Sequence, residues 1–168
     1  EVSESKFIFL TVDEINLLFK STFQKPEYNP NTSEIVYEAI QARDRVMLAV
    51  FYGCGLRRNE GISLDVGDIN FDRSVLHVRK GKNYKERLVP ISKTNLKYLT
   101  EYIYDHRSEL TAGRKTEALF IAYTTGKRMQ GQSLSIRLKN LQYQTEDLDL
   151  QAKEIGLHTL RHSIATQF

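Results

Sequence analysis

The stretch INFDRSVLHVRKGKNYKERLVPI, residues 69–91, decides the fold class because its apolar residues follow a period close to two. Two runs within it, residues 75–79 and 87–91, are rich in Val, Leu and Ile and are typical of short strands. The polar turn over residues 80–85 between them indicates an antiparallel pair. The sequence therefore predicts a small antiparallel sheet over about residues 68–91.

On both sides of this sheet the apolar residues recur at helical spacing instead. Thr11-Val-Asp-Glu14 has the capping-box pattern of a helix start, and Gly53-Cys-Gly55 has the glycines that end one. A turn is expected at Gly126-Lys-Arg128. With 168 residues, 40% of them apolar, the chain is expected to form one mainly α-helical domain around a single core. The expected helices cover residues 11–22, 34–52, 57–64, 93–109 and 133–143, and a last one begins near residue 158.

Charge and cysteine content narrow the class of protein only a little. The net charge is +3, but between Arg73 and Arg87 six cations are opposed only by Glu86, which fits either a directed contact with an anion or a solvated surface. The single cysteine, Cys54, gives neither a disulfide framework nor metal-ligand spacing. No apolar run reaches the length of a membrane span and no signal peptide is visible, so we expect a cytoplasmic protein without a membrane partner.

The first motif with chemical potential is Gly55-Leu-Arg-Arg-Asn-Glu60. A glycine turn here starts a helix, and Arg57 or Arg58 in its first turn can add its N–H donors to the free backbone N–H groups and the positive end of the helix dipole. Such an arrangement binds anions. Taken alone, two arginines at a helix start are more typical of an ordinary exposed surface.

The second motif, Gly81-Lys-Asn-Tyr-Lys-Glu-Arg87, lies at the tip of the expected hairpin. A lysine there can swing into a groove, and nearby cations make its ammonium a better proton donor. That property suits a general acid for an alkoxide leaving group. The plain alternative is a solvated turn.

The third motif is His158-Thr-Leu-Arg161-His162 on the last expected helix. The spacing puts His158, Arg161 and His162 on one helical face, whereas Leu157, Leu160, Ile164 and Phe168 form the other. An apolar face that can be buried would therefore hold two hydrogen-bonding side chains toward a shared ligand.

Together the three motifs suit a phosphodiester. Two guanidiniums can hold the non-bridging oxygens, a lysine can protonate the leaving oxygen, and a histidine can assist proton transfer. The sequence shows no carboxylate cluster for magnesium, so we expect side chains to compensate the charge without metal or other cofactor.

In this order the motifs resemble the catalytic domain of the tyrosine recombinases, the phage-integrase family. The family order is Gly-Leu-Arg-x-x-Glu, then Gly-Lys-x-x-Lys-x-Arg-x-x-Pro, then His-x-x-Arg-His, and the chain matches it at 55–60, 81–90 and 158–162. Asn83 departs from the second glycine that the family often has. The resemblance covers nearly the whole chain and implies a mainly α-helical catalytic domain, with a small sheet, of the tyrosine-recombinase and type IB topoisomerase kind.

The resemblance also implies roles for single residues. Arg57, rather than Arg58, matches the first active-site arginine, and Glu60 matches an acidic supporting residue. Lys82 matches the catalytic lysine of the hairpin, with Lys80 as a nearby rival.

In the third motif His158 and Arg161 match the His-x-x-Arg pair, but none of the nine tyrosines follows Arg161 to match the nucleophile. We therefore expect residues 1–168 to be a single catalytic-domain fragment that lacks the N-terminal DNA-clamping domain and the C-terminal tyrosine segment, and that is inactive alone.

The resemblance implies a site-specific recombinase or integrase that cuts and rejoins double-stranded DNA through a 3′-phosphotyrosine intermediate, self-associating on DNA as a tetrameric synapse. The alternative is a catalytically inactive DNA-binding paralogue or regulatory module; a nuclease of another type would need a metal site. The residues expected to contact DNA are basic side chains on the hairpin and on the helix over 133–143: Arg79, Lys80, Lys85, Arg87, Arg137 and Lys139.

Overall fold

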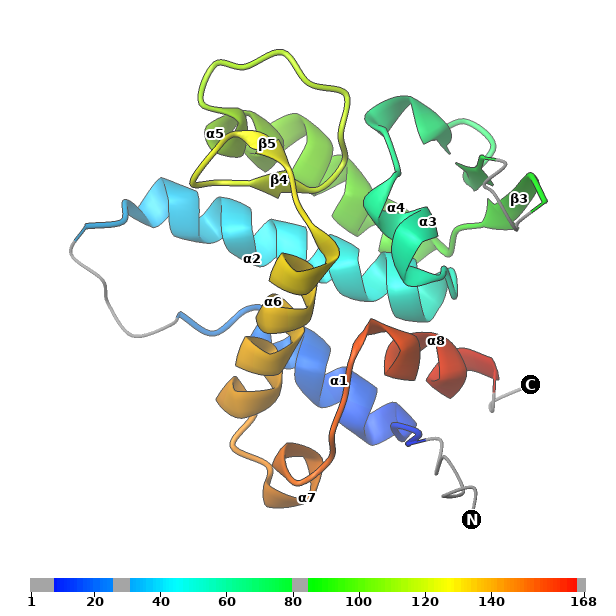
Figure 1. Ribbon diagram of the computed structural model, residues 1–168, viewed down its shortest axis with the longest axis vertical. Helices are drawn as coiled ribbons and strands as arrows, with labels where there is room; N and C mark the ends of the chain where they lie inside the picture. The colour runs from blue at the N-terminus through cyan, green and yellow to red at the C-terminus, as the bar shows by residue number, and fades with distance from the viewer. Residues whose placement is uncertain (1–7, 26–30, 80–84, 166–168) are drawn as a thin grey trace.

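The fold is organised around one long central helix. The computed structural model describes residues 8–25, 31–79 and 85–165. Helix α2 (Glu34–Leu48) begins at the N-cap Ser33, whose side chain accepts from the backbone N–H of Val36, and continues into the π-helical η1 (Ala49–Gly53). Eight residues of α2 are buried, so the helix is the spine of the core (Figure 1).

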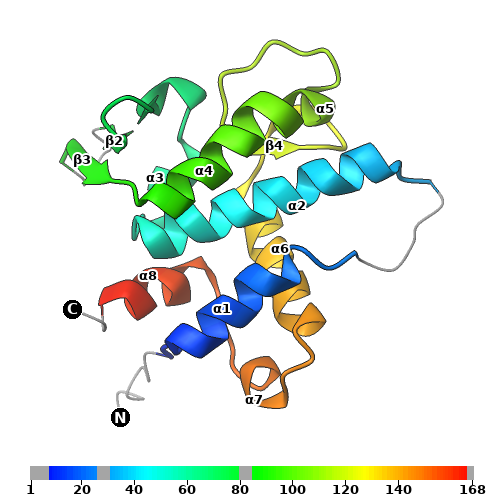
Figure 2. The ribbon, with the colours of Figure 1, turned by 180° about the vertical axis from the view of Figure 1, so that it is seen from behind.

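Two layers of helices cover opposite sides of α2. On one side lies a continuous helical run, which consists of α4 (Lys93–Glu101), the π-helical η3 (Tyr102–His106) and α5 (Arg107–Thr111). On the other side lie α1 (Val12–Ser21), α6 (Gly131–Gln144) and α8 (Leu157–Ala165), with the short α7 (Leu148–Gln151) beyond α6 (Figures 1 and 2). Helix α8 packs against η1.

The predicted antiparallel sheet is confirmed. Strands β1 (Ile69–Asn70), β2 (Val75–Val78) and β3 (Arg87–Pro90) pair in the order β1-β2-β3. The register puts Leu76 opposite Val89 and Val75 opposite Pro90. Pro90 cannot donate to a ladder, and it stands at the end of an edge strand, where this is tolerated.

One local prediction is wrong in detail. Lys127–Arg128, expected in a turn, form β5, which pairs with β4 (Ile121–Ala122) and makes a second, two-stranded sheet. The turn lies just before them, with Gly126 in the left-handed region at φ 70°. Strands of two residues are too short for a period to show in the sequence.

Within the described ranges no helix is long and apolar enough to cross a membrane.

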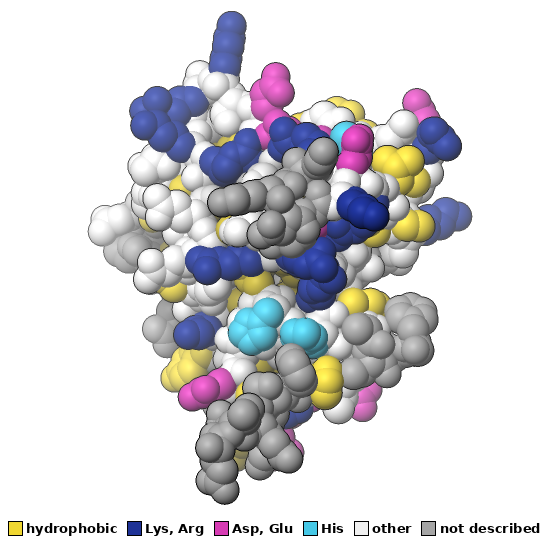
Figure 3. Space-filling view, turned by 45° about the vertical axis from the view of Figure 1, so that its right-hand side comes forward, with side chains coloured by type: hydrophobic (Ala, Val, Ile, Leu, Met, Phe, Trp, Pro, Cys, Tyr) yellow, Lys and Arg dark blue, Asp and Glu magenta, His cyan; other side chains and the backbone are white. Residues whose placement is uncertain are grey.

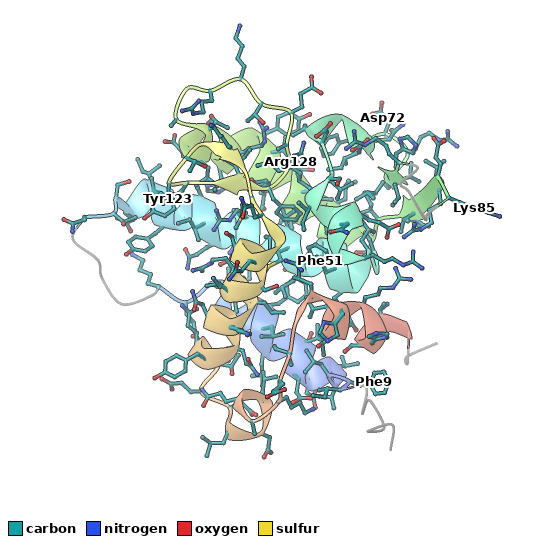
Figure 4. The ribbon with its side chains drawn as sticks, viewed as in Figure 1. Phe9, Phe51, Asp72, Lys85, Tyr123 and Arg128 are labelled. Atoms are coloured by element: carbon teal, nitrogen blue, oxygen red, sulfur yellow. The ribbon has the colours of Figure 1, made fainter. Side chains whose placement is uncertain are left out.

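Helix α3 (Arg58–Ile62) is set close against the core. Phe51 of η1 is fully buried and stacks on Phe120, with ring centroids 6.1 Å apart; Figure 4 shows Phe51 at the centre of the molecule. A Cβ at Gly61 of α3 would lie 2.4 Å from Cζ of Phe51, so this approach requires glycine. The contact fixes the position of Glu60, the residue before it.

Candidate active site

The site begins at the turn between η1 and α3. Gly55 has φ 67°, in the left-handed region that costs residues with a Cβ about 1–2 kcal/mol. After this turn Arg57 takes the extended N-cap conformation, with φ −71° and ψ 155°. The Arg57 backbone N–H donates to Oε1 of Glu60 at 2.9 Å, so Glu60 closes the first turn of its own helix.

Three arginines, one at the N-cap of α3, one in β3 and one in α8, surround the Glu60 carboxylate, whose side chain is 2% exposed. Arg87 of β3 donates to both oxygens, from NH1 to Oε2 at 2.5 Å and from NH2 to Oε1 at 2.9 Å. NH1 of Arg57 lies 3.7 Å from Oε2, and NH1 of Arg161 lies 3.8 Å from Oε1. Burial alone would raise the pKa of Glu60, but the hydrogen bonds from Arg87 and Arg57 and their charges lower it below its usual value.

Helix α8 brings the third motif to the same place. NH1 of Arg161 donates to the carbonyl of Gly55 at 2.8 Å, which joins α8 to the turn before α3. The helix is anchored on its far side, where Oγ of Ser163 accepts from the backbone N–H of Leu10 at 2.8 Å. Leu160 is fully buried, as the apolar face of the predicted helix requires.

The two histidines of α8 lie on its outer face. The ring of His158 is exposed and stands edge-on to that of His162, with centroids 6.3 Å apart. In the space-filling view histidine side chains lie beside a group of Lys and Arg side chains on one face of the molecule (Figure 3).

The structure therefore brings together Arg57, Glu60 and Arg161 and puts His158 on the same helix as Arg161. Lys82, matched to the catalytic lysine, and its rival Lys80 lie outside the described residues. Their roles stay predictions.

The basic residues expected to contact DNA divide into two groups. Lys85 and Lys139 are exposed, and Figure 4 shows Lys85 pointing away from the molecule. The other three described residues have carboxylate partners within the protein. Arg87 pairs with Glu60, Arg137 with Asp44 through contacts of 3.2 and 2.7 Å, and Arg79 with Asp65 and Asp68 at 3.3 and 3.2 Å.

Two further arginines help to build the site: Arg128, expected only as part of a turn, and Arg58, the alternative to Arg57 at the start of the helix. NH1 of Arg128 in β5 donates to the carbonyl oxygens of Ile62 and Leu64, each at 2.8 Å. Arg128 thus supplies hydrogen-bond donors to carbonyl groups at the C-terminal end of α3. The side chain of Arg58 lies against Gly131 at the start of α6. A Cβ at Gly131 would lie only 2.2 Å from Nε of Arg58, so this close packing needs a glycine. The partners are distant in sequence, so no local pattern identifies these contacts.

The chain is similar to known proteins over most of its length. The family model described as "Phage integrase family" matches residues 9–168. This chain belongs to the phage integrase family. Tyrosine recombinase XerD of Pseudomonas putida is 41% identical over 129 residues, which are 77% of this chain and 41% of that protein. Tyrosine recombinase XerC of Chlamydia trachomatis is 34% identical over 126 residues, which are 75% of this chain and 38% of that protein.

Two solved structures have the same fold as this chain. The XerH site-specific recombinase, bound to palindromic difH substrate in a post-cleavage complex, matches with a TM-score of 0.71 at 23% identity, over 95% of this chain and 41% of that one. XerA recombinase matches with a TM-score of 0.68 at 22% identity, over 95% of this chain and 50% of that one. The chain spans about two fifths of the length of the curated relatives it matches.

Proposed function

We propose that the protein carrying this chain is a site-specific recombinase that cuts and rejoins double-stranded DNA through a 3′-phosphotyrosine intermediate. The observation that carries the proposal is the cluster around Glu60, where guanidiniums from the N-cap of α3, from β3 and from α8 share one buried carboxylate. Among the described side chains, three guanidiniums face this one carboxylate, and an excess of positive charge suits a phosphodiester.

In this proposal Arg57 and Arg161 bind the non-bridging oxygens of the scissile phosphate and stabilise charge as its phosphorus becomes pentacoordinate. Glu60 holds the two arginines in place. His158 assists proton transfer, and Lys82 protonates the leaving 5′-oxygen. The nucleophile is a tyrosine that follows Arg161 in the longer protein, and the covalent step conserves the phosphodiester energy without an external source.

The relatives support the reaction class, because those matched at 34–41% identity are tyrosine recombinases by name. The catalytically inactive DNA-binding paralogue is the less favoured alternative. Binding alone needs phosphate contacts spread along a groove, whereas here three guanidiniums meet at one carboxylate.

Covalent trapping tests the proposal in a protein of the relatives' length. The protein is incubated with a pool of nicked duplexes of varied sequence, in which cleavage releases a short strand and cannot be reversed. A denaturing gel should show a protease-sensitive DNA adduct. DNA binding with no adduct from any sequence would favour the binding-only paralogue and overturn the proposal.

Arginine variants in the same assay test the assignment of the clamp. Arg57→Ala or Arg161→Ala should lower the rate of adduct formation by roughly a hundredfold or more, the usual cost of losing one transition-state donor. Most DNA affinity should remain, because many other phosphates are still contacted. A variant that forms adduct at nearly the unchanged rate would remove that arginine from the clamp.

Binding of DNA by this chain alone is the simplest consequence. Exposed cations such as Lys85 and Lys139 should give weak duplex binding, with log affinity falling against log salt by about 0.9 for each phosphate contacted. Self-association into a tetrameric synapse and a cytoplasmic location belong to the same proposal, on the resemblance to tyrosine recombinases. A salt response that is flat would contradict phosphate binding.

A further inference from the structure

Arg87 is the first residue of β3, and its guanidinium is turned inward to Glu60. Its two terminal nitrogens each donate to a different carboxylate oxygen, at 2.5 and 2.9 Å. Such two-point pairing is stronger and more directional than a single ionic contact. The carboxylate is 2% exposed and Arg87 is 33% exposed, so water competes little for this pair.

The remaining arginines of the cluster stand further from the carboxylate. The guanidinium distances of 3.7 Å for Arg57 and 3.8 Å for Arg161 exceed hydrogen-bond length, although both residues are attracted to Glu60. Glu60 accepts from Arg57 through the backbone N–H instead. Within the described part of the chain, the side-chain hydrogen bonds to this carboxylate therefore come from Arg87.

We propose that Arg87 is a positioning residue of the proposed recombinase, which holds both oxygens of Glu60 and so sets Arg57 and Arg161 for the phosphate. Without Arg87 the buried carboxylate would need another partner, because an unpaired buried charge is strongly unfavourable. Among the residues that the structure describes, the cations near this carboxylate besides Arg87 are Arg57 and Arg161. To reach hydrogen-bond length, near 2.8 Å, either guanidinium would move by about 1 Å, a displacement that can lower a catalytic rate by about a hundredfold.

The competing role for Arg87 is the direct DNA contact that the sequence predicts. The two roles differ in salt dependence. A lost phosphate contact lowers the slope of log affinity against log salt by about 0.9, whereas a lost positioning contact leaves DNA affinity and slope unchanged and reduces cleavage.

A double-mutant cycle in a protein of the relatives' length separates the roles. The variants are Arg87→Gln, Arg87→Lys, Glu60→Gln and the double Arg87→Gln/Glu60→Gln. The control is Arg114→Gln, which removes the same charge from an exposed position in the loop after α5. Rates of covalent adduct formation and salt slopes of DNA binding are measured for each.

Arg87→Gln should form adduct about a hundredfold more slowly with an unchanged salt slope. Arg87→Lys should recover part of the rate, since a lysine can pair with one oxygen but not with two. The double variant should be no slower than Glu60→Gln, because Arg87 acts through Glu60. Defects that multiply in the double variant, or a slope that falls with Arg87→Gln, would overturn the proposal.

Side-chain NMR of this chain gives a readout that does not require cleavage. Arg87→Gln should shift the ¹⁵Nε–H resonances of Arg57 and Arg161, whereas Arg114→Gln should leave them in place. Unchanged resonances in folded Arg87→Gln would overturn the positioning role even if the proposed function stands. Shifted resonances in a protein that never forms an adduct would keep the positioning role and reject the proposed function. If Arg87→Gln does not fold, Arg87→Lys replaces it in both measurements.

Discussion

Replacing Asp44 by Asn is expected to destabilise the domain more than replacing its partner Arg137 by Gln. The two side chains form a two-point ion pair between α2 and α6, with contacts of 3.2 and 2.7 Å. The Asp44 side chain is 2% exposed and that of Arg137 is 24% exposed. Removing one partner of a buried pair costs about 3–5 kcal/mol, because the other charge stays buried.

The asymmetry comes from Arg43, which is 3% exposed. Burial lowers the pKa of Arg43, and the charge of Asp44 opposes this shift. Asp44→Asn therefore leaves two guanidiniums without their anion, whereas Arg137→Gln leaves Asp44 with Arg43 still near. We expect the free energy of unfolding to fall by about 5 kcal/mol for Asp44→Asn and by about 3 kcal/mol for Arg137→Gln.

Urea unfolding followed by circular dichroism measures both costs. Lys139→Gln is the matched control, since Lys139 is exposed on the same helix and its replacement should change stability by less than about 0.5 kcal/mol. The reasoning is refuted if Arg137→Gln lowers the free energy of unfolding no more than Lys139→Gln does. It is also refuted if Asp44→Asn lowers it less than Arg137→Gln does. Since the Arg137 guanidinium is held by Asp44, we also expect Arg137→Gln to keep the salt slope of DNA binding.

Three further predictions concern the site. The pKa of Glu60 is lowered in the folded chain, so the ionised Glu60 stabilises the fold fully above the usual carboxyl pKa of 4.5, and this stabilisation is lost as the pH falls through the lowered value. The free energy of unfolding in urea should therefore change less between about pH 5 and pH 3 for Glu60→Gln than for the unchanged chain. Gly55→Ala puts a Cβ at φ 67°, 3.3 Å from Cγ2 of Ile164, and should lower unfolding free energy by at least about 1–2 kcal/mol in the same assay. In a protein of the relatives' length, Lys82→Ala should cleave normal DNA slowly but be rescued on a 5′-phosphorothiolate, whose thiolate leaves without a proton; equal defects on both substrates would contradict the general-acid role.

Most of the fold can be predicted from the sequence because its signals are local. The capping box at Thr11 and the alternating residues before Pro90 each specify an element within a few residues. The helices expected over 34–52 and 93–109 are continuous, but each includes a π-helical turn, at Ala49–Gly53 and at Tyr102–His106. One wide turn shifts the helical period too little for the apolar pattern to show it.

The site could be predicted only in part, because its contacts join distant segments. The motif order points to Arg57, Glu60 and Arg161 as one group, and the structure brings them together. The sequence gives no sign that Arg87 pairs with Glu60, 27 residues earlier. A basic residue on a strand or a helix has the same pattern whether it faces DNA or an internal carboxylate, and Arg137 shows the same ambiguity.

Internal pairing explains why a net charge of +3 is compatible with a strongly positive site. Away from the site, some cations are balanced locally: Arg137 by Asp44, and Lys153 by Glu14 at 2.6 Å. At Glu60 three guanidiniums share one carboxylate, so positive charge is in excess there. Salt screens exposed charges beyond about 10 Å at 0.1 M, so this excess acts on a phosphate close to the cluster and little on phosphates further along the duplex. Such a distribution suits the binding of one scissile phosphate better than the tracking of a long DNA backbone, which is why the cluster favours catalysis over binding alone.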